Sequence, residues 1–204
     1  MDLSEAITFF DANYRAGLTS GAGSTANVTP MYRHIVENFI RLNDIHTVLE
    51  VGCGDWVVSR LIPWDDYDIS YLGLDVSPFI IEKNRSTFGN DHRRFNVIRE
   101  PSEILGLGPF DLILCKDALQ HMPNGVIIEY LDAFAAVGQY SLLTNDVVPS
   151  DNLNGEIVAG GYRALDLRKP PFSRNSSVIA EYVNFFGPMY FVKHVHLLIG
   201  ATSR

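Results

Sequence analysis

Short runs of consecutive apolar residues alternate with amphipathic stretches along most of the chain. Such runs are typical of parallel strands that are covered on both faces. Five of them predict strands at 47–51, 71–76, 95–98, 110–115 and 140–144. Before and between the runs, apolar residues recur at helical spacing. That periodicity predicts helices at 2–15, 30–42, 78–88 and 123–134.

Strands that alternate with helices form right-handed crossovers and a parallel sheet. The end of the chain differs, because an irregular stretch at 151–177 precedes two apolar segments at 182–186 and 190–199. Gly187-Pro188 between these segments is a turn signal. We therefore expect an α/β fold, namely a Rossmann-like seven-stranded, mostly parallel sheet with helices on both faces and a C-terminal antiparallel hairpin.

Composition limits the kind of protein further. The 204 residues suit a single domain, 1–204, and 47% hydrophobic with 20% charged residues is typical of a globular protein. No apolar run reaches the roughly 18 residues that span a bilayer. The N-terminus lacks the positive region of a signal peptide. We expect a cytoplasmic protein with no membrane partner, and its net charge of −8 argues against nucleic-acid binding.

The cysteines and histidines predict no metal site. Cys53 and Cys115 have no CxxC spacing, and His34, His46 and His92 are scattered along the chain. Metal sites need several ligands at characteristic spacings. We expect both cysteines to be small buried residues, and nothing in the pattern predicts an oligomeric state.

A glycine-rich turn, Gly52-Cys53-Gly54, directly follows the first predicted strand. Glycine lets the backbone turn tightly and lets a ligand approach closely. Dinucleotide enzymes use the pattern G-x-G-x-x-G at this place. Here Val57 occupies the third glycine position, which weakens the interpretation as a nicotinamide-dependent oxidoreductase and leaves it open.

Two carboxylates narrow the choice of ligand. Glu50 precedes the first glycine by two residues, where it would repel a pyrophosphate and attract a cation. Asp75 ends the second predicted strand, and a carboxylate there can accept both hydroxyls of a ribose. Together they describe an adenosyl ligand with a positively charged tail.

The motifs resemble those of class I S-adenosylmethionine-dependent methyltransferases. The glycine motif spans 48–54, an acidic residue after the second strand lies in 72–76, and a fourth-strand motif spans 111–121. The resemblance extends over about 30–200 and implies S-adenosyl-L-methionine as the cofactor. In many relatives an N-terminal segment covers the cofactor, which implies such a lid at 1–29.

The resemblance also implies a role for individual residues. Gly52 and Gly54 would pass beneath the methionine moiety, and Glu50 would orient the amino group through a network or water. Asp75 would hold the ribose hydroxyls, with Val76 against the adenine. The full set of implied cofactor-binding residues is Tyr14, Ser20, Glu50, Gly52, Cys53, Gly54, Asp55, Asp75, Val76, Glu100 and Lys116.

Active sites of open α/β sheets lie outside the carboxyl ends of the strands, so residues after the fourth strand should face the acceptor. His121 is a candidate general base, because its ordinary pKa lies near neutrality. Asp117 is a second candidate catalytic residue, which would bind the acceptor or orient a base. The glycines of 151–177 suggest a mobile lid over the site. Candidate acceptor-binding residues in it are Tyr162, Arg163 and Arg168.

We expect a methyltransferase that acts on a small-molecule or sugar-like acceptor. A nicotinamide-dependent oxidoreductase, a protein or peptide methyltransferase and a non-catalytic binding module stay open. Nucleic-acid amino-methyltransferases resemble this chain less, because they carry an Asn/Asp-Pro-Pro-aromatic motif after the fourth strand. Residues 116–119 read Lys-Asp-Ala-Leu at that place.

Overall fold

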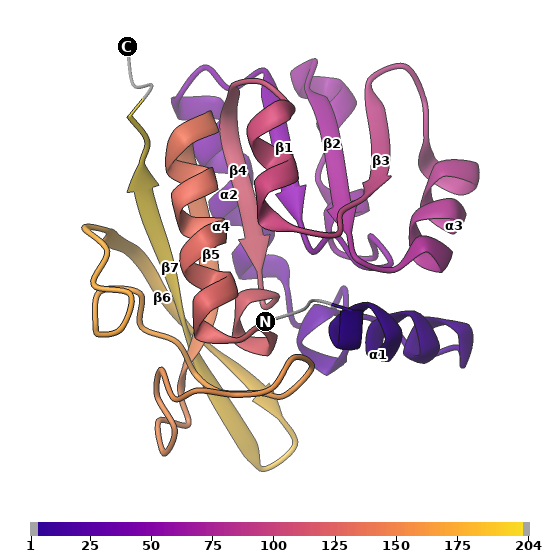
Figure 1. Cartoon of the computed structure of the whole chain (residues 1–204). Coiled ribbons are helices and arrows are strands. Elements are labelled where there is room, and N and C mark those ends of the chain that lie inside the picture. The colour runs from indigo at the N-terminus through magenta and orange to yellow at the C-terminus, as the bar shows by residue number, and fades with distance from the viewer. Residues whose placement is uncertain (1–3, 202–204) are drawn as a thin grey trace.

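The computed structural model describes residues 4–201, which are built around one seven-stranded sheet (Figure 1). Its strands are β1 (Thr47–Val51), β2 (Ser70–Asp75), β3 (Arg93–Val97), β4 (Phe110–Lys116), β5 (Gly138–Val148), β6 (Ser177–Phe186) and β7 (Met189–Ile199). Their order across the sheet is β3-β2-β1-β4-β5-β7-β6. The first five are parallel, whereas β7 runs antiparallel to both β5 and β6. The predicted α/β fold with a C-terminal antiparallel hairpin is confirmed.

Helices cover both faces of this sheet (Figure 1). The helices are α1 (Ser4–Arg15), α2 (Pro30–Leu42), α3 (Pro78–Phe88) and α4 (Asn124–Val137). Apolar residues of α4 share one core with one face of the sheet, and those of α2 and α3 share a second core with the other face. Both faces of β1 and β4 are therefore buried, which is why their sequences are apolar at consecutive positions.

The last strands differ most from the prediction. β6 begins at Ser177 rather than 182, and β5 extends to Val148 rather than 144. β6 is the edge strand, where exposed and more buried positions alternate, so its sequence lacks a continuous apolar run. The end of β5 is long because it pairs with β7 beyond the parallel part of the sheet.

The predicted insertion at 151–177 forms an irregular segment between β5 and β6. It is anchored at several points: the Leu165 amide donates to the Asp146 carbonyl at 2.7 Å, and Leu165 and Leu167 are fully buried in the core that contains α4. Segments with so much buried apolar surface are costly to open. Its middle thus packs on the sheet, and the motion of a lid stays a prediction.

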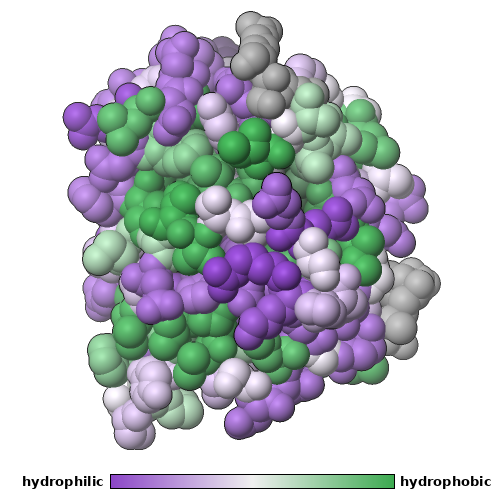
Figure 2. All heavy atoms as spheres, turned by 90° about the vertical axis from the view of Figure 1, so that its left-hand side faces the viewer, coloured by the Kyte–Doolittle hydropathy of each residue, from purple (hydrophilic) through white to green (hydrophobic). Residues whose placement is uncertain are grey.

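The side of the molecule that carries the hairpin has a mixed surface. Apolar groups lie above and below a polar band on this face (Figure 2). Several large apolar side chains of the hairpin are exposed, among them Val183, Phe185 and Tyr190. Among residues 4–201, no helix is long and apolar enough to cross a membrane.

Candidate functional site

A cavity of about 260 Å³ lies at the carboxyl ends of β1, β2 and β4. The chain order reverses between β1 and β4, and ligands of open α/β sheets bind at such a switch point. Several of the residues that the sequence assigns to the cofactor line this cavity: Tyr14, Ser20, Gly52, Gly54, Asp75, Val76 and Lys116. Both candidate catalytic residues, Asp117 and His121, line it as well.

The turn after β1 forms the floor of the cavity. Gly52 and Gly54 have φ angles of 76° and 53°, which side-chain-bearing residues rarely adopt. A Cβ atom on Gly52 would lie 2.5 Å from the Cβ of Ala118, closer than atoms can approach. The amides of Gly52 and Cys53 both donate to the Leu74 carbonyl, at 2.8 and 3.0 Å. This turn is therefore held against β2 and brings bare backbone to the cavity.

Asp75 stands at the end of β2 on the cavity wall. Its Oδ2 accepts from the Gly54 amide and its Oδ1 from the Ser77 amide, each at 3.0 Å. Burial raises its pKa to about 6, although these two hydrogen bonds oppose the shift. Each carboxylate oxygen keeps a free lone pair, so the side chain is fixed in place and can still accept ligand hydroxyls.

Glu50 does not line the cavity. It lies beneath the turn on the face of the sheet that packs against α2, and its carboxylate accepts hydrogen bonds from Ser59 at 2.8 Å and from Tyr71. Burial raises its pKa to about 7, against the effect of the two hydroxyl donors. The structure therefore places this acid behind the turn, where it can influence a ligand through charge rather than through contact.

Three of the other predicted cofactor residues also lie outside the lining. Cys53 is buried behind the turn, and Asp55 turns toward the N-terminal segment. Glu100 is exposed and accepts from the Ser102 hydroxyl at 2.7 Å. This last assignment is corrected, because the chain leaves the sheet before Glu100, and Ile98 is the residue of this loop that lines the cavity.

The N-terminal segment covers the cavity. Ser20 donates to Asp55 Oδ1 at 2.8 Å and accepts from the Asp55 amide at 3.0 Å, and Tyr14 lies 3.1 Å from the same hydroxyl. Lys116 Nζ donates to the Gly23 carbonyl at 3.0 Å and to Ser24 at 3.3 Å. These contacts hold the loop after α1 over the glycine turn, so the loop covers the cavity.

Asp117 lies in a buried group of charges. Its carboxylate contacts Lys116 at 2.5 Å and Lys193 at 2.7 Å, and Lys193 also contacts Asp146 at 2.6 Å. Although burial opposes ionisation, the two lysines lower the pKa of Asp117. Asp117 is therefore ionised and poorly suited to take up a proton, which disfavours it as the base.

His121 has the geometry of a base. Its Nδ1 lies 2.7 Å from the Gly161 carbonyl, so this nitrogen carries the proton and donates. Burial lowers the pKa of the ring, which keeps it neutral at pH 7. The neutral ring then has its lone pair on Nε2, the nitrogen that can accept a proton from an acceptor.

Two of the three predicted acceptor-binding residues lie elsewhere. Arg163 is buried and donates to the Leu119 carbonyl at 3.1 Å and to Asn124 at 2.8 Å. Arg168 forms an ion pair with Asp166 and does not line the cavity. Arg163 ties the 151–176 segment to the loop after β4 and the start of α4, and Arg168 makes its ion pair within the segment, so these two assignments are corrected.

Tyr162 remains close to the site. Its ring centre lies 5.9 Å from that of His121, and its hydroxyl donates to Asp146 at 3.2 Å. The sequence analysis missed Lys193 and Asp146, which join Asp117 to β5 and β7. A single lysine within the apolar run of β7 was the available signal, because buried lysines are almost always paired.

The fold matches known structures, although no family model and no curated protein matches the sequence. Magnesium protoporphyrin IX methyltransferase (ChlM) from Synechocystis PCC 6803 with bound SAH aligns with a TM-score of 0.62 and 16% identity, over 98% of this chain and 100% of that one. A structure from work on converting a disulfide bond into a thioacetal group during echinomycin biosynthesis aligns with a TM-score of 0.63 and 16% identity. The alignment covers 94% of this chain and 91% of that one. The N-terminal domain of EvdMO1 with SAH bound aligns with a TM-score of 0.55 and 15% identity, over 82% of this chain and 80% of that one. The chain thus has the fold of class I S-adenosylmethionine-dependent methyltransferases.

Proposed function

We propose that this protein transfers a methyl group from S-adenosyl-L-methionine to a small-molecule acceptor. The observation that carries the proposal is the pairing of a bare glycine turn with Asp75 across one cavity, at the switch point of this fold. The residues fit the cofactor. Glycine lets the turn pass close against Ala118 and present bare backbone to the cavity, and Asp75 offers acceptors to the ribose hydroxyls.

The remaining walls suit the other parts of the cofactor. Val76 and Ile98 are apolar and lie beyond Asp75, where they would sandwich the adenine. Above pH 7, where both carboxyl groups are ionised, Glu50 and Asp75 supply negative charge near the turn, which favours a ligand with a sulfonium and an ammonium group. When bound, the cofactor supplies an activated methyl group on its sulfonium. This chain's residues would orient it and keep water away.

The acceptor would bind beside His121 and Tyr162. Nε2 of His121 would take the proton of an acceptor hydroxyl while that oxygen bonds to the methyl group, the methyl–sulfur bond breaking with its electron pair going to sulfur; the proton would then rest on Nε2. Asp117 stays ionised and favours the resulting imidazolium through its charge. The buried pairing of Asp117 with Lys193 fixes the loop after β4, so position rather than proton transfer is its contribution.

The alternatives fit less well. A dinucleotide would need a third glycine, and the turn instead continues into Trp56 and Val57. Trp56 is buried against Tyr71 and Phe95, where it fills the space under β2. A protein or peptide acceptor would need a more open entrance than one covered by α1 and its loop. The described cysteines are free and buried, which suits a cytoplasmic location as part of the same proposal.

Calorimetric titration with S-adenosylhomocysteine tests the cofactor assignment. We expect binding by the wild type and an at least tenfold weaker affinity for Asp75→Asn, since the amide loses acceptor capacity toward the ribose hydroxyls. Asp44→Asn is the matched control, because Asp44 is exposed at the opposite end of β1. Absence of binding by the wild type, or equal affinities for both variants, would refute the assignment.

A methyl-transfer screen over small hydroxyl, amine and thiol acceptors tests the activity. For a hydroxyl acceptor, we expect His121→Gln to lower kcat strongly while changing KM little. The affinity for S-adenosylhomocysteine should stay unchanged. Binding of the cofactor without turnover across the screen would favour a binding module instead.

A further inference from the structure

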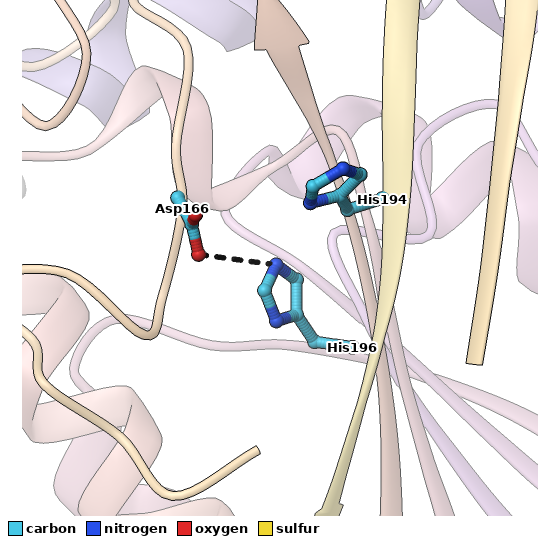
Figure 3. Close-up of side chains that lie close together, drawn as sticks. All are labelled: Asp166, His194 and His196. Atoms are coloured by element: carbon cyan, nitrogen blue, oxygen red, sulfur yellow. Dashed lines mark ion pairs between the residues drawn. The ribbon is translucent and has the colours of Figure 1, made fainter. Parts of the chain in front are cut away.

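Three possible metal ligands meet on the far side of β5 and β7 from α2. His194 and His196 lie two positions apart on β7, so their side chains share one face of the sheet. Asp166 comes from the irregular segment and faces His196 (Figure 3). One donor atom from each residue can be chosen so that all three lie within 4.8 Å of one another. His196 Nε2 and Asp166 Oδ1 are 4.0 Å apart.

Each histidine is oriented by a partner on one ring nitrogen only. His194 Nε2 lies 2.8 Å from a carboxylate oxygen of Glu181, and His196 Nδ1 lies 3.1 Å from the Ser176 hydroxyl. The other nitrogens, His194 Nδ1 and His196 Nε2, are buried without a hydrogen-bond partner. Buried nitrogens without partners are costly, so they need an explanation.

Metal ligation explains this arrangement directly. Metal-bound histidines almost always donate their second N–H to a carboxylate, hydroxyl or carbonyl, which leaves the first nitrogen for the ion. Glu181 and Ser176 occupy those second positions here. Two ligands at 2.0–2.1 Å from a tetrahedral ion lie about 3.4 Å apart. The 4.0 Å pair would therefore shorten by about 0.6 Å on binding, and His194, whose ligand atom lies within 4.8 Å of the other two, would close in by a side-chain movement.

Asp166 also has a place in this geometry. Its carboxylate accepts from the amide and side chain of Arg168 at 2.9–3.1 Å, which orients it toward His196. The Arg168 side chain is 44% exposed and is free to swing into solvent when an ion takes Oδ1. On the neighbouring strand β5, Asn145 pairs in register with His194. Its side chain is fully buried, and neither its amide oxygen nor its amide nitrogen has a hydrogen-bond partner. Directly opposite residues share a face, so this amide points to the same side as the ligands.

We propose that Asp166, His194 and His196 bind one first-row transition-metal ion, with Zn²⁺ as the best fit to two imidazoles and a carboxylate. The ion would link the 151–176 segment, which carries Asp166, to β7. None of the three residues lines the cofactor cavity. The three residues leave one position of a tetrahedral ion for water, and the existence of the site does not depend on methyl transfer.

Metal loading of the chelator-treated, dialysed full chain tests the proposal. After dialysis against micromolar ZnCl₂ and gel filtration, we expect one zinc per chain by elemental analysis and a higher melting temperature than without zinc. Co²⁺ should give visible absorption bands of a low-coordinate site, which zinc should abolish by displacement. A wild type that retains no zinc, or one whose cobalt spectrum equals that of aqueous cobalt, would overturn the proposal without reference to any variant.

Variants locate the ion. We expect His194→Gln and Asp166→Asn each to weaken zinc binding at least tenfold, and Ser176→Ala to weaken it less, through loss of the partner that orients His196. His46→Gln is the matched control, since His46 is exposed and interacts with Asp44 elsewhere. Circular dichroism identifies any variant that fails to fold. Folded ligand variants that bind zinc as tightly as His46→Gln would overturn the assignment.

Discussion

Replacing Glu50 with glutamine should stabilise the protein at pH 8 and leave its stability at pH 4 nearly unchanged. Glu50 is buried beneath the glycine turn, with two hydroxyl donors and no cation in direct contact. A neutral amide keeps one oxygen acceptor. The second hydroxyl can rotate and accept from the amide NH₂, so both contacts survive the change.

The magnitude follows from the pKa of Glu50, which burial raises from 4.5 to about 7. Between those values the folded protein holds a proton that the unfolded chain has already released. Stability therefore falls as pH rises through this window, and the loss is complete above pH 7. Each pKa unit corresponds to about 1.4 kcal/mol, which gives an upper limit of about 3 kcal/mol. Glutamine does not titrate, so Glu50→Gln should recover about 1–3 kcal/mol at pH 8.

Urea unfolding at several pH values from 4 to 8 measures the effect as the difference in midpoint between variant and wild type. Glu129→Gln is the matched control, because Glu129 is exposed on α4 and the same substitution there should change nothing. A midpoint difference for Glu50→Gln that does not vary with pH would refute the reasoning. It would mean that the buried carboxylate is already ionised at low pH and that its neighbours compensate its charge.

Three further substitutions test the site. Gly52→Ala should abolish cofactor binding in calorimetry and cost about 1–3 kcal/mol of stability, because its Cβ would lie 2.5 Å from that of Ala118. Normal cofactor binding by this variant would contradict the assignment of the turn as the cavity floor. Tyr14→Phe removes a 3.1 Å contact with Ser20 and should weaken S-adenosylhomocysteine binding about fivefold, whereas an unchanged Kd would mean that the cover is not coupled to the ligand. Lys193→Met leaves two buried carboxylates without this partner and should cost about 3–5 kcal/mol in urea unfolding; a wild-type midpoint would show that they are solvated.

The central fold was predictable because its signals are local. Each parallel strand is buried on both faces, and this burial forces a continuous apolar run that a sequence displays directly. The bounds of α2, Pro30–Leu42, match the prediction, since Pro30 suits the first turn of a helix. The edge strand β6 gave no such run, because only one of its faces packs on the core.

The position of a residue at the cavity was predictable only where backbone conformation or strand position fixes it. Gly52, Gly54 and Asp75 belong to that class, and their contacts with a cofactor stay a prediction. Arg163 and Arg168 failed because a loop sequence does not reveal whether an arginine faces a ligand or the loop itself.

The proposed metal ligands show the same limit, because the sequence does not reveal which residues an irregular segment brings together. His194 and His196 are adjacent on one strand face, but their third partner, Asp166, reaches them only through the path of an irregular segment. Spacing along the chain therefore predicted no metal site. The buried nitrogens without partners became visible only once the segment had been placed against the sheet.

The N-terminal cover is held differently from the rest of the molecule, and this difference bears on how a cofactor enters. Its contacts near the cavity include several hydrogen bonds: Asp11 accepts from Ser77 at 2.6 Å, Ser20 pairs with Asp55, and Lys116 holds the Gly23 carbonyl. Phe10 and Tyr14 add apolar contacts, one to each core. A hydrogen bond contributes about 1 kcal/mol net, because water replaces it when it breaks. Breaking these hydrogen bonds costs a few kcal/mol, and lifting Phe10 and Tyr14 off the cores adds the cost of exposing two partly buried side chains, which is still less than exposing the sheet core. We expect the cover to open without unfolding the domain, and a bound cofactor that adds contacts to it would keep it closed.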